Sequence, residues 1–260
     1  MTERETWTIP APAGGWSTPW PQCMELAAAI PSTQWTLVGG LMVQLHATAA
    51  GLAITRPTSD VDIVLHIETG ATTSAKVTHR LIRLGYHLEL SLDANAVAHR
   101  FRRGDDQIEV MIADHPAPKM VTIFGGRLPF RIPGGTQALK RTVDALIVSP
   151  TGEETLLSIP NQLWALVLKG AAYLEDSRDR GRHLEDAAVL SARISDPYDM
   201  LALLRGSDRS RITALHNALK DSASTAWLLL EEQYRQHAQD VLRILATNTV
   251  APQVVKRLGE

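Results

Sequence analysis

The segment that decides the fold reads RPTSDVDIV and spans residues 56–64. Its second half begins a β-branched apolar run, residues 61–67, which predicts a β-strand. Side chains two positions apart in a strand project from the same side, so we expect Asp60 and Asp62 to point together. Two adjacent carboxylates repel each other unless a cation lies between them, and their hard oxygens suit Mg²⁺ or Mn²⁺. Because Asp-x-Asp pairs are common, a solvated strand end is the alternative.

Two further features fit a site at this strand. Gly39 and Gly40 follow a predicted strand, residues 34–38, and open a predicted helix. Glycines there let the backbone approach a phosphate, and a helix N-terminus favours an anion. Glu109 is a lone acid between apolar residues of a predicted strand, residues 107–113. If that strand lies beside residues 61–67, Glu109 completes a triad of carboxylates with Asp60 and Asp62. There are two alternatives: Glu109 lies exposed on an edge strand, or Asp114 is the third carboxylate in its place.

The character of the sequence changes near residue 150. Mixed strand and helix patterns precede it, and helical periodicity dominates from residue 160 onward, in segments 160–175, 182–194, 197–205, 208–220 and 223–247. We therefore predict an α+β fold: a proline- and tryptophan-rich extended arm with a short helix (residues 1–30), a mixed-sheet domain (residues 31–150) and a C-terminal helical bundle domain (residues 151–260).

The helical half holds one unusual charge. Lys169 is the only charged residue between Glu154 and Glu175, in an otherwise apolar predicted helix. It either extends its ammonium group to solvent or reaches into a cleft as a phosphate clamp. Asp186, on the next predicted helix, is either an ordinary surface acid or the partner of Lys169 or Arg178.

Composition limits the function classes. The chain has 260 residues, 45% of them hydrophobic, and a formal net charge of −2. This balance argues against a broad nucleic-acid-binding face and leaves two local basic stretches, residues 99–103 and 178–183. Cys23 is the single cysteine, so neither an internal disulfide nor a zinc cluster of thiols is expected. With no signal-peptide pattern and no apolar run of membrane length, we expect a cytoplasmic protein.

These motifs together resemble a known family. Gly39-Gly40, then Asp60-x-Asp62 opening a strand, then the strand acid Glu109 resemble the signature of polymerase-β-like nucleotidyltransferases. The finer pattern Arg56-x-Thr58-x-Asp60, with the distal Lys169, an arginine and Asp186, resembles the AbiEii/MenT-type toxin branch. The resemblance covers roughly residues 35–190.

The resemblance implies an enzyme that moves a nucleoside monophosphate from a nucleoside triphosphate to a hydroxyl acceptor. It implies a tRNA 3′ end as acceptor and a cognate antitoxin as protein partner. It assigns the metal ligands as Asp60, Asp62 and Glu109, the catalytic set as these three with Lys169 and Asp186, and the nucleotide-binding set as Gly39, Gly40, Arg56, Thr58, Lys169 and Arg178. A small-molecule acceptor, a protein acceptor and a non-enzymatic nucleotide-binding regulator are the open alternatives.

Overall fold

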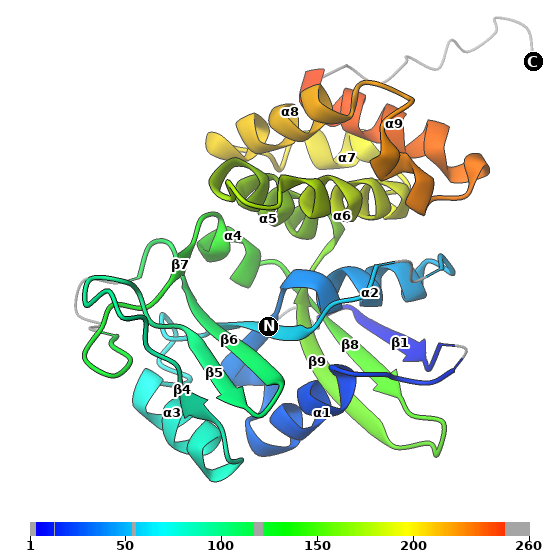
Figure 1. Ribbon diagram of the computed structural model, residues 1–260. Helices are drawn as coiled ribbons and strands as arrows, with labels where there is room; N and C mark the ends of the chain where they lie inside the picture. Colours follow the sequence, from blue (N-terminus) through cyan, green and yellow to red (C-terminus); the bar gives the residue numbers. More distant parts are fainter. Residues whose placement is uncertain (1–3, 13, 54–55, 117–121, 248–260) are drawn as a thin grey trace, which may run out of the picture.

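A computed structural model describes residues 4–12, 14–53, 56–116 and 122–247. In this part of the chain the fold is α+β, with mixed sheets, and helices α5–α9 pack together on one side of them (Figure 1). Helices α1 and α3 lie on the opposite side, at the bottom of the view (Figure 1). The sheets are thus covered from two directions, and their buried apolar side chains form a core continuous with that of the helices.

The larger sheet carries the candidate site. Its strand order is β2-β3-β6-β5-β4, and β7 pairs with the free part of β6. The central pair, β3 and β6, is parallel, whereas β2–β3, β4–β5 and β5–β6 are antiparallel. Its strands are β2 (Trp35–Leu37), β3 (Asp60–Leu65), β4 (His87–Leu88), β5 (Arg100–Arg103), β6 (Asp106–Ala113) and β7 (Arg131–Ile132).

The smaller sheet has the order β1-β8-β9, formed by β1 (Thr6–Pro10), β8 (Thr142–Val148) and β9 (Glu154–Pro160). Strand β1 runs parallel to β8 and buries Trp7 and Ile9. The N-terminal arm is therefore partly a sheet strand, because alternate apolar side chains at positions 7 and 9 fill the core. A hydroxyl contact of 3.2 Å between Thr36 of β2 and Ser158 of β9 links the two sheets.

Side chains at the start of β3 point alternately to the two faces of the sheet, so the core residues there lie on one face and the candidate site residues on the other. Val61 and Ile63 are fully buried, while Asp60 and Asp62, which alternate with them, are half-buried. Because adjacent strand residues face opposite sides, burying the two aliphatic side chains turns both carboxylates to the other face. The remaining helices of the sheet region are α1 (Trp20–Ala29), α2 (Gly39–Ala49), α3 (Ser74–Arg83) and α4 (Gly135–Leu139), with a 3₁₀ turn, η1 (Ser32–Gln34).

The helical region begins later than the predicted boundary at residue 150, which falls in the turn between β8 and β9. Its helices are α5 (Gln162–Glu175), α6 (Arg180–Arg193), α7 (Pro197–Leu201), α8 (Ser207–Leu219) and α9 (Glu232–Thr247), with a 3₁₀ turn, η2 (Thr225–Leu229). Helix α5 is capped at its N-terminus by Asn161, whose side chain accepts a hydrogen bond from the Trp164 backbone N–H. The expected single helix over residues 223–247 is divided between η2 and α9, and the buried Trp227 anchors η2.

No helix in the described part of the chain combines the length and the apolar character that a membrane crossing needs.

Candidate active site

Three carboxylates converge on one face of the larger sheet. The parallel register of β3 and β6 places Asp62 beside Glu109 and Asp60 beside Gln107. One oxygen from each of Asp60, Asp62 and Glu109 lies within 4.8 Å of the others, and all three residues are half-buried. The adjacency of the two strands, on which the predicted triad depended, is therefore present. The alternative of an exposed edge position for Glu109 does not hold, because β6 has neighbours on both sides.

The electrostatics of this cluster favour a bound cation. The pKa of Asp62 is raised to about 8, chiefly by burial and next by the negative charges of Asp60 and Glu109, while the charges of Lys169 and Arg182 partly offset the increase. The protein thus supplies too little positive charge to stabilise three ionised carboxylates. Oxygen donors at this spacing fit a hard divalent cation such as Mg²⁺ or Mn²⁺, which would replace the proton on Asp62.

Polar neighbours fix the other two carboxylates. The Thr58 hydroxyl donates a hydrogen bond of 3.0 Å to Asp60. Glu109 accepts hydrogen bonds of 3.0 Å from the Arg100 guanidinium and from the Gln107 amide. Thr58, which the resemblance places in the nucleotide-binding set, thus contacts a member of the triad directly.

Gly39 and Gly40 allow helix α2 to start against the triad. Gly39 has a positive φ of 68°, and a Cβ atom there would lie 2.5 Å from Asp62 Cγ. A Cβ atom on Gly40 would lie 2.6 Å from Thr58 Oγ1. Only glycine fits both positions, so the N-terminus of α2 opens beside Asp62, where backbone N–H groups favour an anion.

Gly39→Ala is expected to cost more stability than its backbone conformation alone explains. Gly51 is the matched control, because its φ is 70° and no atom lies within 4 Å of a Cβ placed there. We expect Gly51→Ala to lower the free energy of unfolding by about 1 kcal/mol and Gly39→Ala by about 3 kcal/mol, since strain and overlap with Asp62 add. Urea unfolding of both variants measures the difference. Equal losses would show that Gly39 is not packed against Asp62.

A second charged cluster, from here on called the latch, joins the helical region to the loop before β3. The Lys169 ammonium lies 2.7 Å from the Asp186 carboxylate, and the Arg56 guanidinium donates two hydrogen bonds to the same carboxylate at 2.8 and 3.0 Å. Lys169 and Asp186 are 6% and 2% exposed. Burial opposes the charge on Asp186, but Lys169 and Arg56 outweigh it and lower its pKa. Lys169 therefore does not extend to solvent, and Asp186 is not a surface acid.

The arginine-rich turn is organised by Asp176. The Arg178 backbone N–H donates to the Asp176 carboxylate at 2.8 Å, while the Arg182 side chain and His183 contact it at 3.0 and 3.2 Å. Arg178 does not pair with Asp186. The arginine of this turn whose charge acts on Asp62 is Arg182. Arg182 lies in the basic stretch predicted from the sequence, residues 178–183, but the sequence does not distinguish it from the other arginines there, because no local pattern shows which one acts on the triad.

The other predicted basic stretch is largely neutralised. Besides Arg100, which contacts Glu109, Arg102 pairs with Glu89, and Arg103 pairs with Glu25 and Asp106. Asp114, the rival to Glu109, instead accepts hydrogen bonds from the Gly134 and Thr136 backbone N–H groups at 2.7 and 3.0 Å. Asp114 therefore caps the start of α4 and is not part of the metal cluster.

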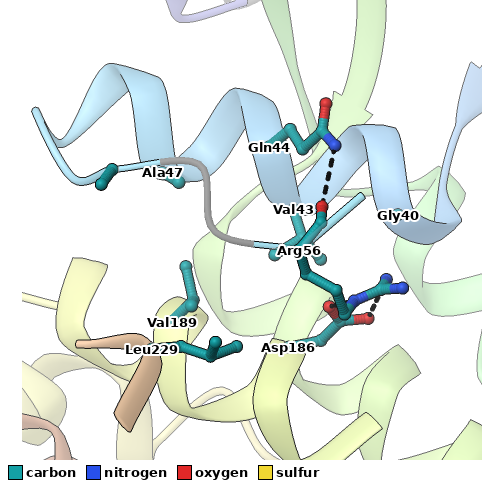
Figure 2. Close-up of a pocket in the computed structure, with 9 residues that line it drawn as sticks. Gly40, Val43, Gln44, Ala47, Arg56, Asp186, Val189 and Leu229 are labelled. Atoms are coloured by element: carbon teal, nitrogen blue, oxygen red, sulfur yellow. Dashed lines mark hydrogen bonds and ion pairs between the residues drawn. The ribbon is translucent and has the colours of Figure 1, made fainter. Parts of the chain in front are cut away.

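A small pocket lies beside the latch, between α2 and α6 (Figure 2). Gln44 donates a hydrogen bond of 3.1 Å to the Arg56 carbonyl and so fixes the loop that presents the guanidinium to Asp186. The pocket is lined by Gly40, Val43, Gln44, Ala47, Ala53, Arg56, Asp186, Val189 and Leu229. The phosphate-binding candidates Gly40 and Arg56 thus line one opening.

The residues around the triad and the latch come from both regions of the chain. Strands β3 and β6 and the start of α2 supply the carboxylates and glycines, while α5 and α6 supply Lys169 and Asp186. A comparison of the chain with known proteins finds no matching family model, no matching curated protein and no matching solved structure.

Proposed function

We propose that this protein is a metal-dependent nucleotidyltransferase of the polymerase-β-like type. The observation that carries the proposal is the convergence of three carboxylates beside a Gly-Gly helix start. The carboxylates suit a hard divalent cation, and the helix start suits an anion. A nucleoside triphosphate with its bound divalent cation requires both kinds of site side by side. The α+β fold with a following set of packed helices is compatible with this family.

Asp60, Asp62 and Glu109 would hold Mg²⁺ or Mn²⁺. When bound, the cation stabilises negative charge on the phosphate oxygens and on the attacking and leaving oxygens. The acceptor hydroxyl oxygen forms a bond to the α-phosphorus of the nucleoside triphosphate. The bond from that phosphorus to the bridging oxygen of the β-phosphate breaks, and pyrophosphate leaves. Glu109 accepts the hydroxyl proton.

The triphosphate would lie across Gly39 and Gly40, with Lys169, Arg56 and Arg182 as its cations. Asp186 holds Lys169 and Arg56 through one carboxylate. An ammonium group has three donors and a guanidinium five, so both keep donors for phosphate oxygens while Asp186 orients them. Arg178, which is exposed on the arginine-rich turn, is a further phosphate contact in this proposal.

The proposed acceptor is a tRNA 3′ end, and the proposed cellular role is that of a cytoplasmic toxin held in check by a cognate antitoxin. The experiment incubates the protein with Mg²⁺, each α-phosphate-labelled nucleoside triphosphate in turn, and either total tRNA, aminoglycosides or casein. Label in tRNA supports the proposal and names the nucleotide. Label only in the small molecule or the protein moves the acceptor to that class. No label in any acceptor with any nucleotide overturns nucleotidyl transfer.

Stabilisation by Mg²⁺ is expected to depend on pH through Asp62. Its folded-state pKa of about 8 lies above the ordinary 3.8, so without metal the folded state holds this proton more tightly than the unfolded chain. The protonated Asp62 carboxyl therefore contributes fully to the free energy of unfolding below pH ~4, and this contribution is lost as the pH rises toward ~8. We expect Mg²⁺ to raise the melting temperature more at pH 8 than at pH 6, because the competing proton is weaker there.

Thermal unfolding of the wild type and of Asp62→Asn, with and without Mg²⁺, measures this effect. The Asn variant cannot lose a proton at this position, so it should lack both the pH-dependent loss and most of the stabilisation by Mg²⁺. An equal Mg²⁺ response at both pH values, or an unchanged response in Asp62→Asn, would contradict a metal site at Asp62.

A further inference from the structure

An aromatic pair, the half-buried His99 and the exposed Phe130, lies next to the triad. His99 Nε2 is 3.9 Å from Glu109 Oε1, and the His99 ring centroid is 5.3 Å from that of Phe130, with the planes inclined by 42°. Phe130 is 38% exposed, whereas the other large aromatic side chains near β5, Phe101 and Phe124, are buried. A phenylalanine ring open to solvent beside a polar site offers a flat apolar face to a ligand.

The backbone fixes this pair in place. The Val110 N–H donates to the His99 carbonyl at 2.7 Å, and the Ile112 N–H donates to the Phe130 carbonyl at 3.0 Å. Both rings are thus attached to β6, the strand that carries Glu109. A parallel bridge between Ala98 and Pro129 joins the two segments to each other. The aromatic pair is therefore a firmly held surface, which makes its exposure a feature of the fold.

The surroundings combine apolar area with the hydrogen-bond donors of a guanidinium group. Leu128 is 64% exposed and Val97 is 39% exposed, and the Ala98 N–H donates to the Leu128 carbonyl, so the two paired segments that carry His99 and Phe130 also carry exposed aliphatic side chains. Arg100, whose side chain is 37% exposed, lies on the side toward the triad, where it pairs with Glu109 and Glu89. A guanidinium group has five donors, so some remain for a phosphate oxygen. A ligand with a flat apolar ring and an anionic backbone matches this order of side chains.

We propose that the His99–Phe130 pair stacks the unpaired terminal base of a single-stranded RNA end, placing the hydroxyl of that nucleotide at Glu109. This inference rests on the proposed function and specifies its acceptor. Bases at single-stranded ends can be splayed onto aromatic side chains, whereas bases inside a duplex cannot. A stacking surface is also tolerant of base identity, so the pair would select a free 3′ end and not a particular sequence.

The test measures binding directly, so that it does not depend on catalysis. A fluorescein-labelled single-stranded oligoribonucleotide with a free 3′ hydroxyl is titrated with protein carrying Asp60→Ala, and fluorescence anisotropy gives the dissociation constant. We expect Phe130→Ala to weaken binding by about 5- to 150-fold, which corresponds to the loss of one stacked base. Phe130→Trp should retain affinity within about 2-fold, because it keeps a stacking face.

Leu228→Ala is the matched control, since Leu228 is 66% exposed and belongs to η2, a different element from those that carry the triad and the aromatic pair. Circular dichroism melts verify that each variant is folded. Unchanged RNA affinity in Phe130→Ala, or an equal loss in Leu228→Ala, would overturn the proposal. Equal affinity for the oligonucleotide and for a blunt duplex would overturn it as well.

Failure of the proposed function would look different. Label transfer is measured with Asp60 intact, in the wild type and in Phe130→Ala. Transfer to RNA with the same KM for RNA in both proteins would show that the aromatic pair is not part of the acceptor site, while the proposed transferase activity would stand. Phe130-dependent RNA binding without label transfer from any nucleotide would support the stacking site and reject the transferase.

Discussion

Asp60→Ala is expected to lower nucleotidyl transfer by about 10³-fold or more, the largest effect of any substitution considered for this protein. Asp60 and Asp62 project from one face of β3, and each supplies one oxygen to the same cluster. Removing one carboxylate leaves two ligands, which hold a divalent cation poorly. The rate of α-phosphate label transfer at saturating Mg²⁺ measures the loss.

Asp105→Ala is the control for this substitution. Asp105 is an exposed aspartate in the turn between β5 and β6, so its removal changes the net charge by the same amount in the same region. We expect transfer within about 2-fold of the wild type, since exposed substitutions away from a site have small effects. Full activity in Asp60→Ala would show that the chemistry takes place elsewhere in the molecule.

Asp186→Ala is expected to lower the free energy of unfolding by about 3–5 kcal/mol, because it leaves the Lys169 ammonium buried without its carboxylate and frees the Arg56 guanidinium. Lys169 and Asp186 are almost entirely buried, so solvent screens their interaction weakly. Urea-induced unfolding gives the change. Glu185→Ala, the neighbouring acid, should cost no more than about 0.5 kcal/mol, because the described residues give it no ion pair.

A double substitution distinguishes the cost of an unpaired buried charge on Lys169 from the cost of lost side-chain packing at position 186. If the loss in Asp186→Ala comes from an unpaired buried charge, then Lys169→Met combined with Asp186→Leu should recover most of the stability, while transfer stays lost. A loss below about 1 kcal/mol in Asp186→Ala, with transfer unaffected, would contradict both the structural and the functional role given to the latch.

Local sequence patterns were sufficient to find the central carboxylates. Strand alternation identified Asp60 and Asp62, and the lone acid in an apolar strand identified Glu109, because both signals depend only on near neighbours in the chain. The expected helices of the second half also correspond closely to α5–α8, since their apolar periodicity is strong.

The remaining features depend on contacts between distant parts of the chain. Arg56 meets Asp186 across 130 positions, and no local pattern specifies that pairing. The same is true of β1, which joins β8 in a sheet although its surroundings are rich in proline. His99 and Phe130 are 31 positions apart (130 − 99), and only the attachment of both segments to β6 brings their rings together.

The position of the transferred phosphorus tests the account most directly. The wild-type protein and Asp60→Ala are incubated with Mg²⁺ and acceptor RNA, once with α-phosphate-labelled and once with γ-phosphate-labelled nucleoside triphosphate. If the protein is a nucleotidyltransferase, the wild type transfers the α-label into the RNA and releases the γ-label in pyrophosphate. Asp60→Ala is expected to give neither labelled RNA nor labelled pyrophosphate. Entry of the γ-label into the acceptor, or α-label transfer that persists in Asp60→Ala, would contradict it.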